Sequence, residues 1–141
     1  MKVPDVNVML AAHRDDHVHH TAARSWLDAL THRGERLGVP DMVWGSFVRL
    51  TTNRRIFSTP APLAEAFGFV QAVRALPGHV SVAAGHRHLE IFERVCLESG
   101  AIGDLVPDAQ LAALAIELGA ELVSFDRDFA RVPGLRWTRL E

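Results

Sequence analysis

The chain has 141 residues, 48% of them hydrophobic, and a formal net charge of −2 at pH 7 with a pI of about 6.4. That length suits a single domain with its own core, and the slightly acidic charge excludes a protein that holds nucleic acid through a strongly basic overall field. No signal peptide opens the chain, no run of about 18 apolar residues occurs, and Cys96 is the only cysteine, so we expect a cytoplasmic protein with no membrane span and no internal disulfide.

The first half of the chain predicts short strands that alternate with helices. In chain order, the expected elements are a strand over 1–4, helices over 6–12 and 16–32, a strand over 37–39 and a helix that begins near Pro40. Apolar residues recur at helical spacing within 16–32, and Asp15 and Asp16 stand at its start as candidate N-caps. Proline is favoured in a first helical turn because its missing N–H has no partner there in any case.

The second half continues the alternation. Its expected elements are helices over 63–76, 86–98, 107–119 and 127–131, and strands over 79–83, 122–125 and 135–138. Short apolar strands between helices favour an α/β fold in which a short parallel sheet is covered by helices on both faces. In such sheets the active crevice lies beyond the carboxyl ends of the strands.

Aspartates stand at several element ends. Asp5 directly follows the first strand, Asp126 follows the strand over 122–125, and Asp128 comes two residues later. Asp104 and Asp108 are four residues apart, so they share one face if the helix over 107–119 begins early enough. A single aspartate at such a position is usually a cap or a turn residue, whereas several at matching strand and helix ends favour a shared site.

Carboxylates that a fold draws together need a counter-charge. Two unit charges about 4 Å apart repel by roughly 1 kcal/mol in water and about 4 kcal/mol at an effective dielectric constant near 20. Lys2 is the only lysine of the chain, so a hard divalent cation with oxygen ligands, Mg²⁺ or Mn²⁺, is the natural partner. We therefore expect Asp5, Asp108 and Asp126 to hold one metal ion that assists phosphodiester hydrolysis.

Four stretches of the chain carry a family resemblance. Asp5–Ala12 resembles the opening of PIN-domain ribonucleases, in particular the VapC-type toxins of bacterial type II toxin–antitoxin modules. Pro107–Ala115 resembles the third acidic motif of that family, Ser124–Phe129 resembles the fourth, and Pro133–Trp137 resembles the tail that follows it. These short motifs stand in the family's order and cover nearly the whole chain.

The resemblance implies a PIN-like three-layer fold, with residues 1–141 as a single nuclease domain. It implies an endoribonuclease that depends on Mg²⁺ or Mn²⁺ and cleaves structured RNA of the transfer or ribosomal class. It also implies a cognate antitoxin as partner and a homodimer. It carries metal-binding roles onto Asp5, Asp108 and Asp126, and catalytic roles onto these three with Asp104 and Asp128.

One departure from the family pattern leaves other functions open. The family usually places a glutamate on the helix after the second strand, but residues 41–50 contain none, and Asp41 is better interpreted as a helix cap. A PIN module that binds antitoxin or RNA without cutting therefore remains an alternative. A Mg²⁺-dependent phosphoryl switch or phosphatase is a weaker one, because such sites normally use a lysine and Lys2 precedes the first aspartate.

Polar residues outside the acidic set are candidates for RNA contacts. Arg49, Arg54 and Arg55 suit phosphate groups, although the last turn of a helix also favours exposed cations without any ligand. Asn7 and Ser124 are expected to support the acidic site, with a helix cap and a buried hydroxyl as their plain alternatives.

The spacing of His13 and His17 allows a transition-metal pair, but no cysteine or glutamate in order completes it. A solvated helix start is the favoured interpretation of these two histidines.

Overall fold

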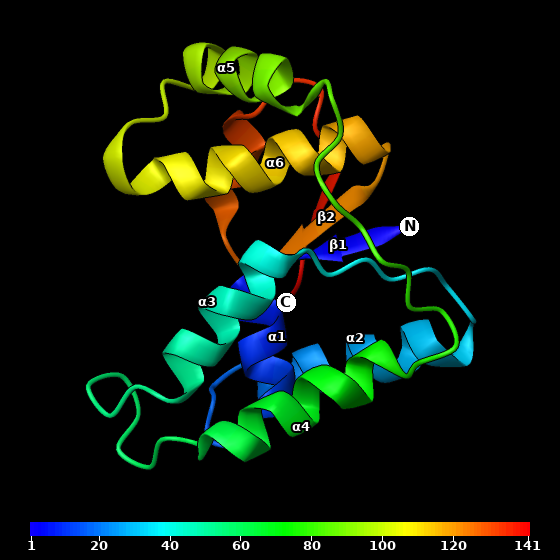
Figure 1. The fold of residues 1–141 in the computed structure, drawn as a ribbon, viewed down its shortest axis with the longest axis vertical. Helices are drawn as coiled ribbons and strands as arrows, with labels where there is room; N and C mark the ends of the chain where they lie inside the picture. Colours follow the sequence, from blue (N-terminus) through cyan, green and yellow to red (C-terminus); the bar gives the residue numbers. More distant parts are fainter.

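A short parallel sheet forms the middle layer of the protein (Figure 1). The computed structural model describes all residues, 1–141. Strands β1 (Lys2–Pro4), β2 (Glu121–Ser124) and β3 (Trp137–Arg139) pair in the order β1-β2-β3. The first and last parts of the chain therefore meet in one sheet.

Helices cover both faces of this sheet. Their bounds are α1 Val6–His13, α2 His20–His32, α3 Asp41–Thr51, α4 Leu63–Arg74, α5 His88–Ser99 and α6 Val106–Leu118, with short 3-10 helices η1 at Gly103–Leu105 and η2 at Arg127–Arg131. In Figure 1, α5 and α6 lie on one side of the strands and α1, α2 and α4 on the other. The predicted three-layer α/β fold is confirmed. No helix is both long and apolar enough to cross a bilayer.

The core runs without a break through all three layers. Twenty-nine buried residues form one hydrophobic cluster. Helices α1 and α6 both contact β2, and six of the thirteen residues of α6 are buried, four of them alanines that let the helix lie close to the sheet. Gly119 ends α6 in a left-handed conformation with φ of 64°, which a residue without Cβ adopts readily. The packing of α1 and α6 fixes the two helix starts that border the acidic edge.

Two predicted strands were wrong in extent. Residues 37–39 and 79–83 form no strands, and only the single bridges Lys2–Leu37 and Leu37–His79 extend the sheet beyond β1. The Val80 N–H donates to the Leu37 carbonyl at 2.8 Å, as in a parallel ladder. Pro40 and the turn at Gly78 leave no room for a second pair on either segment. The two bridged segments therefore run parallel to β1, but only three segments of the chain form strands.

The predicted start of the second helix was also wrong. Helix α2 begins at His20 rather than at residue 16, and its N-cap residue, His19, makes no capping side-chain hydrogen bond. Asp16 is not a cap, because both of its carboxylate oxygens accept hydrogen bonds from Arg14 at 2.8 Å. An ion pair with a buried arginine thus replaces the expected cap.

Arg14 joins the end of α1 to the loop between α3 and α4. Its guanidinium donates to the Thr51 hydroxyl at 3.2 Å and to the Thr59 carbonyl at 2.6 Å, besides pairing with Asp16. The same group lies 3.8 Å from the centre of the Phe57 ring, within cation–π range. The side chain is only 7% exposed. One buried cation therefore anchors two loops.

We expect Arg14→Met to lower the free energy of unfolding by about 2–4 kcal/mol, because the apolar side chain leaves buried acceptors without a donor. Urea denaturation monitored by circular dichroism measures this change. The matched control is Arg24→Met, whose exposed side chain meets only Asp28, at 3.3 Å, and which should cost less than about 0.5 kcal/mol. Equal losses in the two variants would contradict the anchoring role of Arg14.

Candidate active site

The two strand-end aspartates lie side by side at one edge of the sheet. Pro4 of β1 pairs with Val123 of β2 in parallel register, and the Asp5 N–H donates to the Val123 carbonyl at 2.8 Å. Asp5 and Asp126 both come after the carboxyl ends of these neighbouring strands. Two residues that are 121 positions apart in sequence thus share the crevice edge that the alternating pattern predicts.

The Ser124 hydroxyl connects the two aspartates. It donates to Asp5 Oδ2 at 2.8 Å and accepts from the Asp126 backbone N–H at 2.9 Å. The Asn7 side-chain nitrogen donates to the Ser124 hydroxyl oxygen at 3.2 Å, and the Asn7 side-chain carbonyl accepts from the Phe125 N–H at 3.4 Å. Ser124 is fully buried. These contacts fix the Asp5 side chain. Asn7 and Ser124 thus lie next to the acidic residues that they were expected to support.

Asp5 has a second, structural task. Its Oδ1 accepts from the Val6 N–H at 2.7 Å and caps α1. The residue is only 7% exposed, so burial raises the pKa of its carboxyl, and the Asp126 charge adds to this while the hydrogen bonds from Ser124 and Val6 oppose it. Both oxygens are held in place, yet each keeps a free lone pair for another ligand.

Asp108 faces these two aspartates from the first turn of α6. Half-burial, and after it the charges of Asp5, Asp126 and Asp128 in that order of strength, together raise the pKa of its carboxyl from 3.8 to about 6. The positive end of the α6 dipole lies at the same turn but does not cancel this repulsion. Asp108 is therefore the carboxyl most sensitive to any positive charge that enters the site.

No basic side chain neutralises this group. The four ion pairs of the structure are Lys2–Glu121, Arg14–Asp16, Arg24–Asp28 and Arg33–Glu35. No three His, Cys, Asp or Glu side chains lie close enough together to hold a metal ion, so Asp5, Asp108 and Asp126 would have to move closer to one another to share one ion as predicted. The donors fit a hard divalent cation in chemistry, as carboxylate oxygens facing one space with no cation of their own.

The other predicted acids take outer positions. Asp128 is exposed on η2, where its N–H donates to Asp126 Oδ1 at 2.9 Å, and its charge acts on Asp108. Asp104 is exposed on η1 and is not among the charges that act on Asp108. Asp41 is exposed as the first residue of α3 and makes no capping bond, so its interpretation as a helix cap was wrong, and it is not among the charges that act on Asp108.

The three predicted RNA-binding arginines lie away from the acidic edge. Arg49 is in the last turn of α3, and Arg54 and Arg55 are in the turn that follows; all three are exposed. Helix α3 starts near the strand ends and runs away from the sheet (Figure 1), and eleven helical residues span roughly 16 Å. These cations are thus suited to a phosphate some nucleotides distant from the aspartates.

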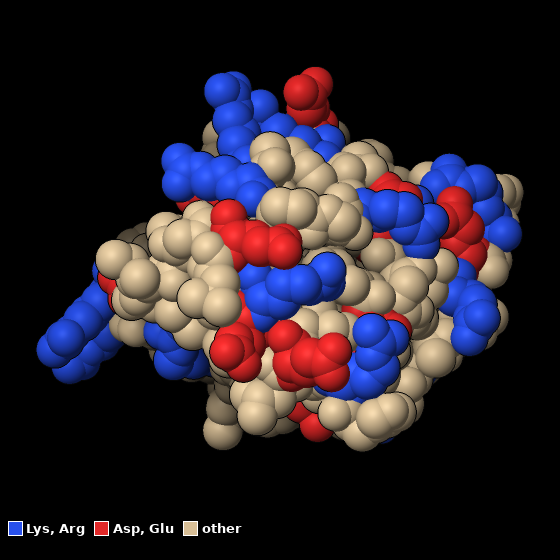
Figure 2. Space-filling view, turned by 90° about the horizontal axis from the view of Figure 1, so that it is seen from above, with Lys and Arg blue, Asp and Glu red and all other residues tan.

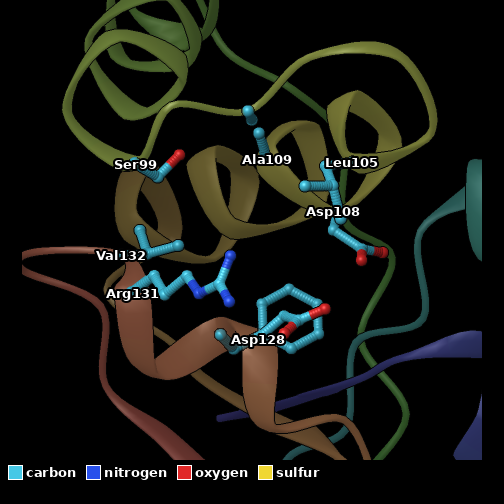
Figure 3. A pocket seen from close by; sticks show the side chains of 9 residues that line it. Ser99, Leu105, Asp108, Ala109, Asp128, Arg131 and Val132 are labelled. Atoms are coloured by element: carbon cyan, nitrogen blue, oxygen red, sulfur yellow. The ribbon is translucent and has the colours of Figure 1, made fainter.

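Arg131 is a nearer cation that the sequence patterns did not single out. It lines a small cavity between α6 and η2 together with Asp108, Asp128 and Phe129, and Figure 3 shows its guanidinium extending into that space. Only its place five residues after Asp126, on a 3-10 helix, hints at this position. Basic and acidic side chains otherwise alternate across the face drawn in Figure 2, so no continuous basic surface covers that face.

His13 is not at a solvated helix start, as the sequence suggested. Its ring packs against Phe47 and Phe69, with ring centres 5.3 and 5.0 Å away, and burial lowers its pKa. No metal-binding group includes it or His17. His13 is a packing residue beneath α3 and α4.

A model of the PIN domain matches residues 2–135 of the chain. The chain belongs to the PIN-domain family. Ribonuclease VapC25 of Mycobacterium tuberculosis is 52% identical to it over 135 residues, which cover 96% of this chain and 95% of that relative. This level of identity places the protein among the VapC-type PIN ribonucleases, as the sequence motifs predict.

Solved structures share the PIN fold at low identity. VapBC2 from Rickettsia felis, crystallised with a DNA fragment from its promoter, superposes with a TM-score of 0.71 at 14% identity and covers 99% of this chain and 98% of that one. VapC20 of Mycobacterium tuberculosis, described as a toxin that cleaves the sarcin–ricin loop, has a TM-score of 0.64 at 16% identity, with 96% and 99% covered. These PIN-fold structures match nearly the whole chain in architecture.

Asp108 gives the site a measurable pH dependence. Its pKa is raised from 3.8 to about 6, so between these values the folded protein holds a proton that the unfolded chain releases, and stability falls as pH rises through this window. Asp108→Asn removes the effect. Without metal, we expect its free energy of unfolding relative to the wild type to rise by about 1 kcal/mol from pH 4 to pH 7, after allowance for solvent screening.

Urea titrations in EDTA at the two pH values measure this difference. Asp104→Asn is the matched control, because its exposed carboxylate does not act on Asp108, and its difference should be the same at both pH values. A pH-independent effect of Asp108→Asn would show that the carboxylates do not repel as the geometry implies.

Proposed function

We propose that this PIN-domain protein is the endoribonuclease toxin of a type II toxin–antitoxin pair and that it uses Mg²⁺ or Mn²⁺. The single observation that carries the proposal is the group of carboxylates at the strand edge, Asp5, Asp108 and Asp126, which repel one another and form no ion pair with a basic side chain. Such a group is costly for folding, and a bound dication relieves that cost.

The metal would be held by the carboxylates of Asp5, Asp108 and Asp126, with Asp128 and Asp104 as outer acids of the site. Bound Mg²⁺ or Mn²⁺ supplies positive charge that favours a deprotonated water and offsets charge on the phosphate in the transition state. The chain's own residues do the positioning. Ser124 and Asn7 hold the Asp5 carboxylate in one orientation, and a bound cation would favour the deprotonated form of Asp108 over the protonated one.

RNA is the proposed substrate, in the structured class that includes transfer and ribosomal RNA. The likeness in fold to a toxin that cleaves the sarcin–ricin loop agrees with this class. A metal-loaded acidic centre attracts phosphate locally although the protein carries a net charge of −2. Arg131 beside the centre and Arg49, Arg54 and Arg55 beyond α3 then hold flanking phosphates.

A cognate antitoxin and a second copy of the chain are the proposed protein partners. The fold matches a toxin chain from a VapBC assembly. Several large apolar side chains are exposed on the helices, including Leu63 and Phe67 on α4 and Leu89 and Leu97 on α5. Exposed apolar side chains at helical spacing suit contacts with another helix.

Cleavage of RNA by the purified chain tests the proposal directly. With Mg²⁺, we expect a structured RNA to be cut, and we expect Asp5→Asn, Asp108→Asn and Asp126→Asn each to lower the rate about 100-fold or more, on the scale of losing an electrostatic contact in the transition state. Asp28→Asn, an exposed change on α2, should leave the rate unchanged. Gel analysis of labelled RNA with and without EDTA measures these rates.

Activity that survives in EDTA or in the Asp108→Asn variant would refute the metal mechanism. Metal binding and antitoxin binding without any cleavage would support the alternative of a PIN module that does not cut.

The remote arginines predict a salt effect. If Arg54 and Arg55 each contact a phosphate, the double alanine variant should lower the slope of log affinity against log salt by about 1–2, since each contact releases nearly one counterion. Fluorescence anisotropy at several salt concentrations measures the slope. Arg33→Ala, which removes an exposed cation paired with Glu35, is the control and should leave the slope as it is. An unchanged slope in the double variant would place the RNA elsewhere.

A further inference from the structure

A stacked pair of aromatic rings, exposed His19 on half-buried Phe125, stands at the end of β2. The rings of His19 and Phe125 stack with centres 4.4 Å apart and planes at 14°. Phe125 stands between Ser124, which binds Asp5, and Asp126. His19 comes from the opposite end of the chain, in the turn before α2. Phe125 is therefore the next residue in sequence to Ser124 and to Asp126, and its stack with His19 joins the turn before α2 to the end of β2.

One face of the stack is available to a ligand. Phe125 is half-buried and packs on the core, whereas His19 is exposed. A third ring, that of His17, lies 5.8 Å from His19 with its plane tilted by 40°. Since one face of the His19 ring covers Phe125 and the residue is exposed, the ring keeps surface that is open to solvent.

The turn that carries His19 is held in place without the stack. The His19 N–H donates to His17 Nδ1 at 3.0 Å, and Nδ1 of His20 donates to the Ala11 carbonyl at 2.8 Å. The pairing of Arg14 with Asp16 fixes the start of the same turn. Because these contacts already order the backbone, the stack is not required to hold the loop, and it presents a preorganised surface.

We propose that the His19–Phe125 pair is a stacking site for one unpaired RNA base next to the scissile phosphate. Flat aromatic rings, histidine among them, bind unstacked bases of single-stranded RNA by their faces. Such a site holds any base, so it places the strand over Asp126 and Asp5 rather than reading its sequence. The proposal rests on the ribonuclease function proposed above, because it needs RNA at the acidic edge.

Abasic substitution separates this role from a structural one. The probe is a short fluorescent single-stranded RNA, with variants that each lack one base, bound to protein in an Asp108→Asn background so that it stays uncut. For the Asp108→Asn protein that keeps His19, we expect the loss of the base at one RNA position to weaken binding about 5- to 100-fold, which is the scale of one base–aromatic stack. His19→Ala should weaken binding of the intact RNA to the same extent and lose sensitivity to that position, and His19→Trp should restore both.

Two controls accompany this measurement. His32→Ala removes an exposed histidine at the far end of α2 and should bind the intact RNA as the parent does. Urea denaturation should show the same stability for His19→Ala and its parent, which excludes a folding defect. Phe125→Leu, which keeps the apolar packing but removes the ring, should reproduce the abasic insensitivity of His19→Ala.

Three outcomes decide the matter. An intact-RNA affinity or an abasic profile that His19→Ala leaves unchanged overturns the stacking site while the ribonuclease function stands. Weaker binding of a co-purified antitoxin with unchanged RNA binding would make this surface a protein contact and also overturn it. Absence of RNA binding and cleavage in the wild type would instead refute the proposed function itself.

Discussion

The parallel pairing of β1 with β2 is the constraint on which the site depends. It joins the first residues of the chain to residues near its end, and it sets Asp5 and Asp126 next to each other at the carboxyl edge. The buried Ser124 hydroxyl then couples the two by hydrogen bonds of 2.8 and 2.9 Å. A shift of one residue in this register would turn Ser124 to the other face of the sheet and separate the aspartates.

The acidic centre opposes folding. Burial raises the carboxyl pKa of Asp5 and Asp108, and the charge of a neighbouring aspartate raises it further in both. Part of this cost is offset locally, because Asp5 also caps α1 and Asp126 caps η2. A ligand that binds only the folded protein lowers the free energy of that state, so it offsets the cost of the repulsion. The alanine-rich packing of α6 keeps Asp108 in place despite the repulsion.

Loops and helix ends around the acidic edge carry positively charged side chains, which the acidic group itself does not contain. Arg14 anchors the turn that carries His19 and also the loop that carries Arg54 and Arg55. One buried cation therefore links the two candidate RNA contacts on the α1 side, while Arg131 borders the α6 side. The arrangement places cations around an acidic centre without neutralising it, in keeping with a net charge near zero.

Sequence alone determined the α/β class, most helices and the acids that follow strands, because apolar periodicity and strand-end position are local signals. Residues 41–50 likewise showed that the family's glutamate is missing. Tertiary structure decided the rest. It reduced 37–39 and 79–83 to bridges, moved the start of α2, buried Arg14, packed His13 against Phe47, and stacked His19 on Phe125. These features depend on contacts between distant segments, whose geometry no local pattern encodes.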